Sequence, residues 1–149
     1  MNGLLEVHIT GGRIGESIVL HLPDGKWGVV DCYVPTLAEP TSSSSFRFLQ
    51  ERGVTDLAFL CLTHPDADHC RGMSLFLEKF LIGQFWMFGA KSPSELYQRI
   101  AALLKIRAVK LQEPAPMLEE ADDFAKTIRL VKAMRQAKKI DYVPMSQGG

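Results

Sequence analysis

Hydrophobic and polar residues alternate along the first part of the chain, in short stretches separated by turn-forming residues. This alternation predicts strands at residues 5–9, 17–22 and 27–33. Glycines within residues 11–15 predict the first turn, and residues 23–26 (PDGK) have the composition of the second. Because both connections are short, we expect three consecutive antiparallel strands.

The pattern then changes. Residues 35–45 are polar and end in four consecutive serines, which predicts a flexible loop, and a short helix is expected over residues 46–52, ending at Gly53. Residues 57–62 (LAFLCL) form a continuous apolar run, as in a strand buried on both faces. A helix over residues 73–80 and a strand over residues 84–88 are expected to follow it.

The last part of the chain predicts two helices and a strand. A capping box at residues 92–95 (SPSE) begins the first helix, and the second runs over residues 118–139. The second helix is acidic in its first turns and basic in its last turns, which suits the helix dipole. A strand begins at Asp141. Together these elements predict a mixed α/β fold, in a single domain over residues 1–149.

Composition narrows the function classes only slightly. Lys plus Arg and Asp plus Glu each number 17, so net charge gives no argument for nucleic acid or an anionic membrane as partner. No apolar run reaches the roughly 20 residues of a membrane span, and residues 1–6 lack the features of a signal peptide. Cys32, Cys61 and Cys70 show no CxxC spacing, which favours a reducing cytoplasm over a disulfide scaffold.

The candidate chemistry lies directly after the apolar run, in residues 63–69 (THPDADH). His64, Asp66, Asp68 and His69 are all potential metal ligands, and a loop at the end of a buried strand holds such side chains on a rigid platform. Such a loop could serve two metal ions about 3.5–4 Å apart, as in two-metal hydrolytic sites. The alternative is a turn with local hydrogen bonds and no metal.

This stretch resembles the HxHxDH signature of the metallo-β-lactamase superfamily, in the form HxDxDH. It looks most like the hydrolase domain of the DNA-uptake channel proteins of competent bacteria and their soluble relatives. Residues 12–17 (GRIGES) resemble the glycine turn before the second strand of that group, and residues 29–31 (VVD) resemble its strand that ends in a supporting Asp. The resemblance covers the layout of the whole chain, but only the motif is specific.

The resemblance implies an αββα sandwich with a metal site at one edge. His64 and Asp66 would bind the first metal and Asp68 and His69 the second, with Asp68 also near the activated water. Asp31 and Thr63 would support these ligands from behind, although Asp31 could itself be a ligand. Zinc is expected, and manganese or iron are alternatives because Asp66 supplies oxygen where many members have His.

The family takes further ligands, two His and a bridging Asp, from the second half of its fold. No His follows His69, so we expect a truncated half-sandwich that binds metal weakly and turns over poorly. The first functional hypothesis is a metal-dependent hydrolase acting on a small-molecule ester or a phosphodiester, with nucleic acid only weakly supported. The alternative is a non-catalytic interaction module whose exposed sheet is covered by a homo-oligomer or a partner chain.

Other residues have simpler explanations. Cys70 is expected to pack inward rather than bind metal, and the glycine turn is expected to be a hairpin rather than an anion nest. The basic end of the helix expected over residues 118–139 could bind a phosphodiester, but a solvated helix face is expected. This end carries Lys126, Arg129, Lys132, Arg135, Lys138 and Lys139. Structural roles are also expected for His8, His21, Trp27 and Trp86.

Overall fold

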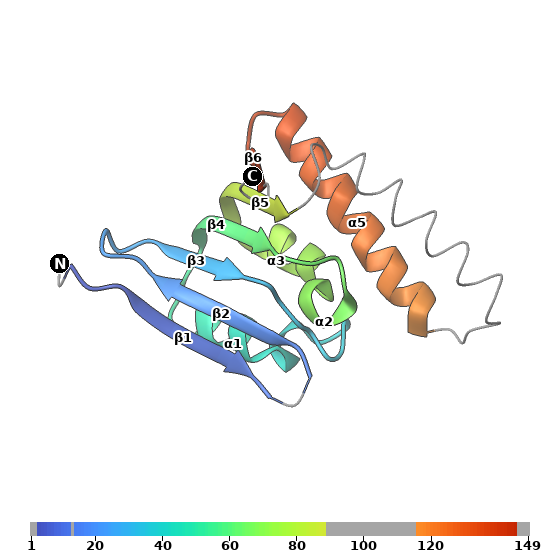
Figure 1. Cartoon of the computed structure of the whole chain (residues 1–149), viewed down its shortest axis with the longest axis horizontal. Helices are drawn as coiled ribbons and strands as arrows, with labels where there is room; N and C mark the ends of the chain where they lie inside the picture. The colour runs from blue at the N-terminus through green and yellow to red at the C-terminus, as the bar shows by residue number, and fades with distance from the viewer. Residues whose placement is uncertain (1–2, 13, 89–115, 146–149) are drawn as a thin grey trace.

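The computed structural model describes residues 3–12, 14–88 and 116–145. Within these ranges six strands form one sheet in the order β1-β2-β3-β4-β5-β6 (Figure 1). The first two pairings are antiparallel and the last three are parallel, so β3, β4, β5 and β6 all run in the same direction. The strands are β1 (Glu6–Gly11), β2 (Glu16–His21), β3 (Trp27–Val30), β4 (Asp56–Leu62), β5 (Leu81–Phe88) and β6 (Asp141–Met145).

Helices connect the parallel strands, as crossover connections require. They are the 3-10 helix η1 (Pro40–Ser42), α1 (Ser44–Glu51), α2 (Ala67–Cys70), α3 (Met73–Lys79) and α5 (Pro116–Gln136). The mixed α/β fold predicted from the sequence is confirmed. The helix expected to begin at residue 92 lies outside the described residues.

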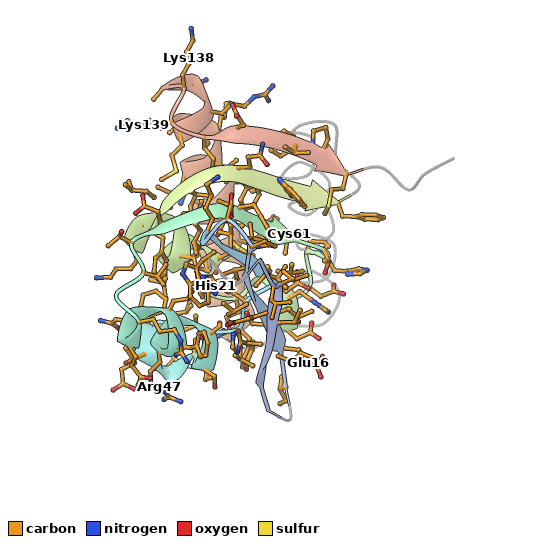
Figure 2. The ribbon with its side chains drawn as sticks, turned by 90° about the vertical axis from the view of Figure 1, so that its left-hand side faces the viewer. Glu16, His21, Arg47, Cys61, Lys138 and Lys139 are labelled. Carbon is orange, nitrogen blue, oxygen red and sulfur yellow. The ribbon has the colours of Figure 1, made fainter. Side chains whose placement is uncertain are left out.

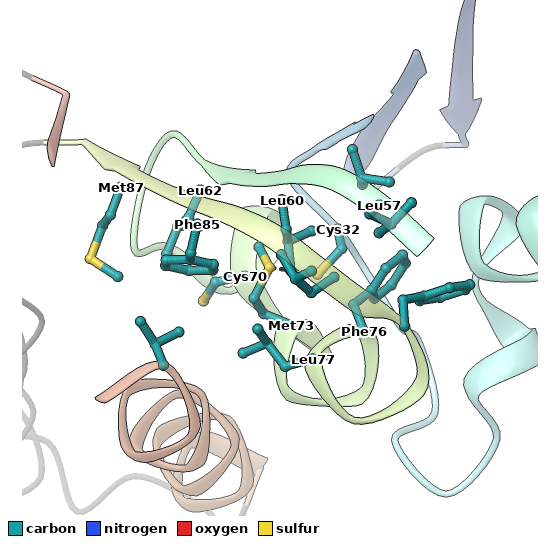
Figure 3. Packing of buried hydrophobic residues seen from close by; sticks show 14 of the residues in the cluster. Cys32, Leu57, Leu60, Leu62, Cys70, Met73, Phe76, Leu77, Phe85 and Met87 are labelled. Atoms are coloured by element: carbon teal, nitrogen blue, oxygen red, sulfur yellow. Dashed lines mark hydrogen bonds between the residues drawn. The ribbon is translucent and has the colours of Figure 1, made fainter. Parts of the chain in front are cut away.

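One hydrophobic core joins α1, α3 and α5 to a single face of the sheet. Val29, Leu60 and Phe85 are fully buried at paired positions of β3, β4 and β5. Met73, Phe76 and Leu77 of α3 point toward this row (Figure 3), and α5 adds Phe124, Ile128 and Val131. In the side view, α1, which carries Arg47, lies near the β1–β2 hairpin, and Lys138 and Lys139 lie at the opposite end of the sheet (Figure 2).

The predicted flexible loop at residues 35–45 is wrong in its second half. Residues 40–42 form η1, and α1 begins at Ser44 instead of residue 46. Ser43 and Ser45 are buried, and their hydroxyl groups lie 3.0 Å apart. Ser43 also accepts a hydrogen bond from the backbone N–H of Phe46, so the serines cap a helix instead of forming a loop.

The third strand is shorter than the predicted 27–33, because Asp31 takes a left-handed conformation with φ of 55°. Asp is among the few residues that accept this conformation. The backbone therefore leaves the sheet at Asp31, which turns its side chain toward the loop after β4. This bend positions the candidate site.

The other face of the sheet is also apolar. Alternation along the strands places Phe59 and Cys61 on it; both are buried, but neither belongs to the core cluster. The Phe59 ring stacks on Trp86 with centroids 4.5 Å apart and lies flat against Gly28, where a Cβ would come within 2.3 Å of the ring. No helix in the described part of the chain has the length and apolar character needed to cross a membrane.

Candidate metal site

The candidate loop runs from the end of β4 at Leu62, through the short helix α2, to the start of α3 at Met73. Because β3 and β4 are parallel, both strands end at the same edge of the sheet. The backbone N–H of Asp31 donates to the carbonyl of Cys61 at 2.8 Å, and Cys32 N–H donates to the carbonyl of His69 at 2.9 Å. These bonds fix Asp31 beside the loop, although it is distant in sequence.

The Asp31 carboxylate is the structural centre of this loop. Its Oδ1 accepts the backbone N–H of Thr63 at 2.8 Å. Its Oδ2 accepts the Thr63 hydroxyl at 2.5 Å and contacts His69 Nδ1 at 2.8 Å. The side chain of Asp31 is only 11% exposed. Both oxygens face protein donors, so the carboxylate holds Thr63 and His69 in place; that Asp31 and Thr63 thereby orient metal ligands stays a prediction.

These bonds also select a tautomer for the two histidines. His69 Nδ1 faces Asp31, an acceptor, so it carries the proton in the neutral ring. His64 Nδ1 lies 3.1 Å from the Thr63 hydroxyl, whose own proton goes to Asp31, so His64 Nδ1 is also the donor. In both rings Nε2 keeps its lone pair, as a metal ligand must. The ring centroids of His64 and His69 are 5.2 Å apart.

The predicted ligands are only partly brought together. Asp68 Oδ2 lies 3.6 Å from His69 Nε2, close to the roughly 3.3 Å that separates two ligands on one tetrahedral zinc. Asp66 is exposed at the start of α2, and its side chain makes no capping hydrogen bond. Across the described ranges no three His, Cys, Asp or Glu side chains stand ready to hold a metal ion. The donors therefore fit zinc in type and in one spacing, without a preassembled cage.

Electrostatics at His69 follow from its neighbours. Partial burial acts to lower the pKa of His69, but the hydrogen bond to Asp31 and the charges of Asp31, Asp68 and Asp66 outweigh it and raise the pKa above its usual 6.5. A proton and a metal ion would compete for the same Nε2 atom. Metal affinity at this loop should therefore fall as the pH is lowered.

A second buried carboxylate fixes the other end of the loop. Asp123 belongs to the acidic first turns of α5, which by sequence suit the helix dipole; in the structure its side chain faces inward and is 7% exposed. Its two oxygens accept the backbone N–H of Gly72 at 2.8 Å and the hydroxyl of Ser74 at 2.5 Å. Burial raises the pKa of Asp123, and these two hydrogen bonds only partly offset the effect. Asp123 thus caps α3 from a neighbouring helix.

Arg71 completes this end of the loop. Its Nε donates to the carbonyl of Val34 at 3.0 Å, and its own carbonyl accepts the Val34 N–H at 2.9 Å. Gly72 follows with φ of 87°, and an added Cβ would lie 2.1 Å from a Val34 methyl. Only glycine fits this turn, so the segment after the motif is as closely fixed as the segment before it.

The other candidate residues have structural roles. Cys70 is buried in the core, as expected, and its thiol lies 3.5 Å from the Pro65 carbonyl. His21 stacks on Trp27 with centroids 4.2 Å apart, and His8 packs on Phe48 at 4.6 Å. Nε2 of His8 is buried without a hydrogen bond in the described ranges, although Glu6 Oε2 lies 3.4 Å away in an unsuitable direction.

An open cavity of about 840 Å³ lies away from the motif, at the opposite end of the parallel strands. Its lining includes Lys26, Arg52 and Lys139, together with the first residues of β4 and β5. None of the motif residues lines it.

The chain matches no protein-family model and no curated protein sequence.

Proposed function

We propose that this chain carries the metal site of a metal-dependent hydrolase. The observation that carries the proposal is the orientation of His69: Asp31 holds its Nδ1 at 2.8 Å, and its Nε2 lies 3.6 Å from the Asp68 carboxylate. A buried carboxylate behind an outward-facing imidazole is the usual support of a metal-binding His. The HxDxDH pattern of the same loop supports this proposal.

Each residue then has a separate task. Asp31 and Thr63 hold both imidazoles in the tautomer that offers Nε2. His64, Asp66, Asp68 and His69 are the proposed ligands, and Asp68 is the residue placed to take a proton beside the reacting water. A bound divalent cation, zinc before manganese or iron, would supply an activated water and polarise the substrate bond.

The proposed substrate is an ester or a phosphodiester. The basic residues of α5 add little support for nucleic acid, because two of them are engaged within the chain: Lys126 pairs with Glu78 at 2.7 Å, and Arg135 lies over the Tyr142 ring at 5.5 Å. A small molecule is therefore the preferred substrate class. We also propose the cytoplasm as its compartment, since Cys32, Cys61 and Cys70 are all buried and form no disulfide within the described ranges.

Zinc titration of the purified chain, followed by calorimetry, tests the proposal. We expect weak binding by the wild type and at least a tenfold loss in His64→Ala and Asp68→Ala. His21→Ala and Asp24→Ala are matched controls, because they remove the same side-chain types away from the loop. Equal zinc affinity in all five proteins would refute the metal site.

Activity is tested separately with a panel of esters and phosphodiesters. We expect slow turnover that depends on added metal and disappears in Asp68→Ala. Robust hydrolysis by the chain would contradict the expectation of poor turnover.

The second candidate function is an interaction module without catalysis. The observation that favours it is the exposed apolar surface of β1, where Val7 is 53% and Ile9 is 73% exposed. Self-association without zinc binding would favour this candidate, whereas zinc binding lost in the ligand variants would favour the hydrolase.

A further inference from the structure

Strand β1 is an open edge of the sheet. It pairs with β2 on one side, and in the described part of the chain no strand pairs with its other side (Figure 1). Natural proteins usually protect such an edge with Pro, Lys or a bulge. Residues 6–11 (EVHITG) contain neither Pro nor Lys, and each of them pairs in unbroken register with β2. The outer backbone groups of β1 are thus available to another strand.

The two faces of β1 differ sharply. Leu5, Val7 and Ile9 fall on the face away from the core and are 55%, 53% and 73% exposed. Glu6 and His8 fall on the other face, with side chains 57% and 31% exposed. An added strand would have to continue an apolar row on one face and a polar row on the other.

A second copy of β1 meets both requirements. Antiparallel strands related by a two-fold axis perpendicular to the sheet keep the same residues on the same face. Centring that axis on Val7 places Val7 opposite the partner's Val7, and Leu5 opposite the partner's Ile9. The same register places Glu6 opposite the partner's His8 twice, so that a carboxylate, which accepts hydrogen bonds, faces an imidazole, which can donate one.

Neighbouring registers lack this complementarity. An axis centred on Glu6 sets two carboxylates against each other, and an axis centred on His8 sets two imidazoles against each other. The chain has no net charge, so two copies do not repel at long range.

We propose that two copies of this chain associate through antiparallel pairing of β1, with the two-fold axis at Val7. The joined sheet would continue from one chain into the other. A contact between two short strands lies at the small end of specific interfaces, below about 1,200 Å² in total, so the dimer should be weak and depend on protein concentration. This proposal is independent of the metal site.

Cysteine cross-linking of the full chain tests the register directly. In Val7→Cys the two new thiols face each other, with Cα atoms about 4.5–5.5 Å apart, within the range of a disulfide. In Ile9→Cys the two thiols are offset by four residues, about 13 Å along the strands, which is too far. The native cysteines are buried and do not interfere. We therefore expect mild oxidation to cross-link Val7→Cys and not Ile9→Cys.

Two further measurements complete the test. A mixture of Leu5→Cys and Ile9→Cys should cross-link as a heterodimer, because these positions are opposite in the proposed register. Sedimentation velocity should show a reversible wild-type dimer that Val7→Lys abolishes. A wild-type chain that stays monomeric at high concentration overturns the proposal, as does a Val7→Cys that cross-links no better than Ile9→Cys.

Discussion

Removing the Asp31 carboxylate should have two separable effects, one on stability and one on the state of His69. In Asp31→Ala, Thr63 loses two acceptors and His69 loses one. A hydrogen bond to a charged group contributes about 1.5–3 kcal/mol, so three would sum to roughly 5–9 kcal/mol if independent. Water reaches the partly exposed Thr63 and His69, and the cost of burying the carboxylate disappears. We expect a net loss of about 3 kcal/mol, typical of breaking a buried charged contact.

Asp31→Asn separates the two effects. Asn tolerates the left-handed backbone at this position and keeps one oxygen for the Thr63 N–H, so about 1–2 kcal/mol should be lost. Its amide NH₂ would now face His69 Nδ1, a donor opposite a donor. The neutral ring should respond by moving its proton to Nε2, which removes the lone pair proposed to bind metal.

Urea unfolding measures the first effect, and long-range ¹H–¹⁵N correlation spectra of the histidine rings measure the second. Asp24→Ala serves as the control, because Asp24 is exposed in a turn, where it pairs with Lys26 and lies away from the candidate loop. Its unfolding midpoint and histidine spectra should match the wild type. If His69 in Asp31→Asn keeps its proton on Nδ1, or if Asp31→Ala unfolds within about 1 kcal/mol of the wild type, Asp31 does not control the loop.

Three other predictions concern groups around the same loop. Asp123→Asn should lower the free energy of unfolding, measured with urea, by about 2 kcal/mol, because the buried Gly72 N–H and the Ser74 hydroxyl cannot both keep an acceptor. Asp122→Asn, at an exposed position, should leave the free energy of unfolding unchanged. Burial raises the pKa of Cys61 to about 12 and also raises the pKa of Cys32 well above its usual value. All three cysteines are buried, so no thiol should react with a disulfide reagent in the native state and three should react after unfolding; a fast native reaction would show that the core opens. Because the pKa of His69 is raised, its charged form stabilises the fold below its unfolded pKa near 6.5, and this contribution is lost as the pH rises through the folded value. The stability difference between wild type and His69→Asn should shrink from about pH 6 to pH 8, and a difference that grows would contradict the pairing with Asp31.

Local patterns were sufficient to predict most elements. The apolar run at residues 57–62 became β4 over Asp56–Leu62, and the alternating segment at residues 17–22 became β2 over Glu16–His21. Errors occurred where a long-range contact overrides composition. Ser43 and Ser45 belong to a polar run, yet contacts with the rest of the chain bury both, and this burial leaves no mark in the sequence.

At the candidate site, too, local patterns in the sequence were informative and long-range contacts were not. Its proposed ligands lie within six residues of the sequence, so a motif could indicate them. Asp123 supports the loop from α5, far along the chain, and its acidic neighbours Glu119, Glu120 and Asp122 suggested only a dipole effect. The one available signal was weak: a carboxylate one position before the apolar Phe124, on the buried side of the helix. Helical periodicity could have assigned Asp123 to the core face, but it could not have shown that Asp123 contacts the N-terminus of α3.

The backbone of the candidate loop is held in place, whereas its proposed ligand side chains are not gathered around one point. Asp31 fixes the start of the loop, Asp123 and Arg71 fix its end, and all three act through hydrogen bonds to backbone groups. Among the ligand side chains, the two imidazoles contact Asp31 and Thr63, but Asp66 and Asp68 are exposed, and among the described residues no three ligands converge. A cation would therefore find an ordered backbone and oriented imidazoles but would have to order the two Asp side chains itself, at a cost below the roughly 1.5–2 kcal/mol of the longest side chains. Affinity should then depend mainly on the number of ligands, so a variant that adds one His near Nε2 of His69 should gain more zinc affinity than any variant that stiffens the loop.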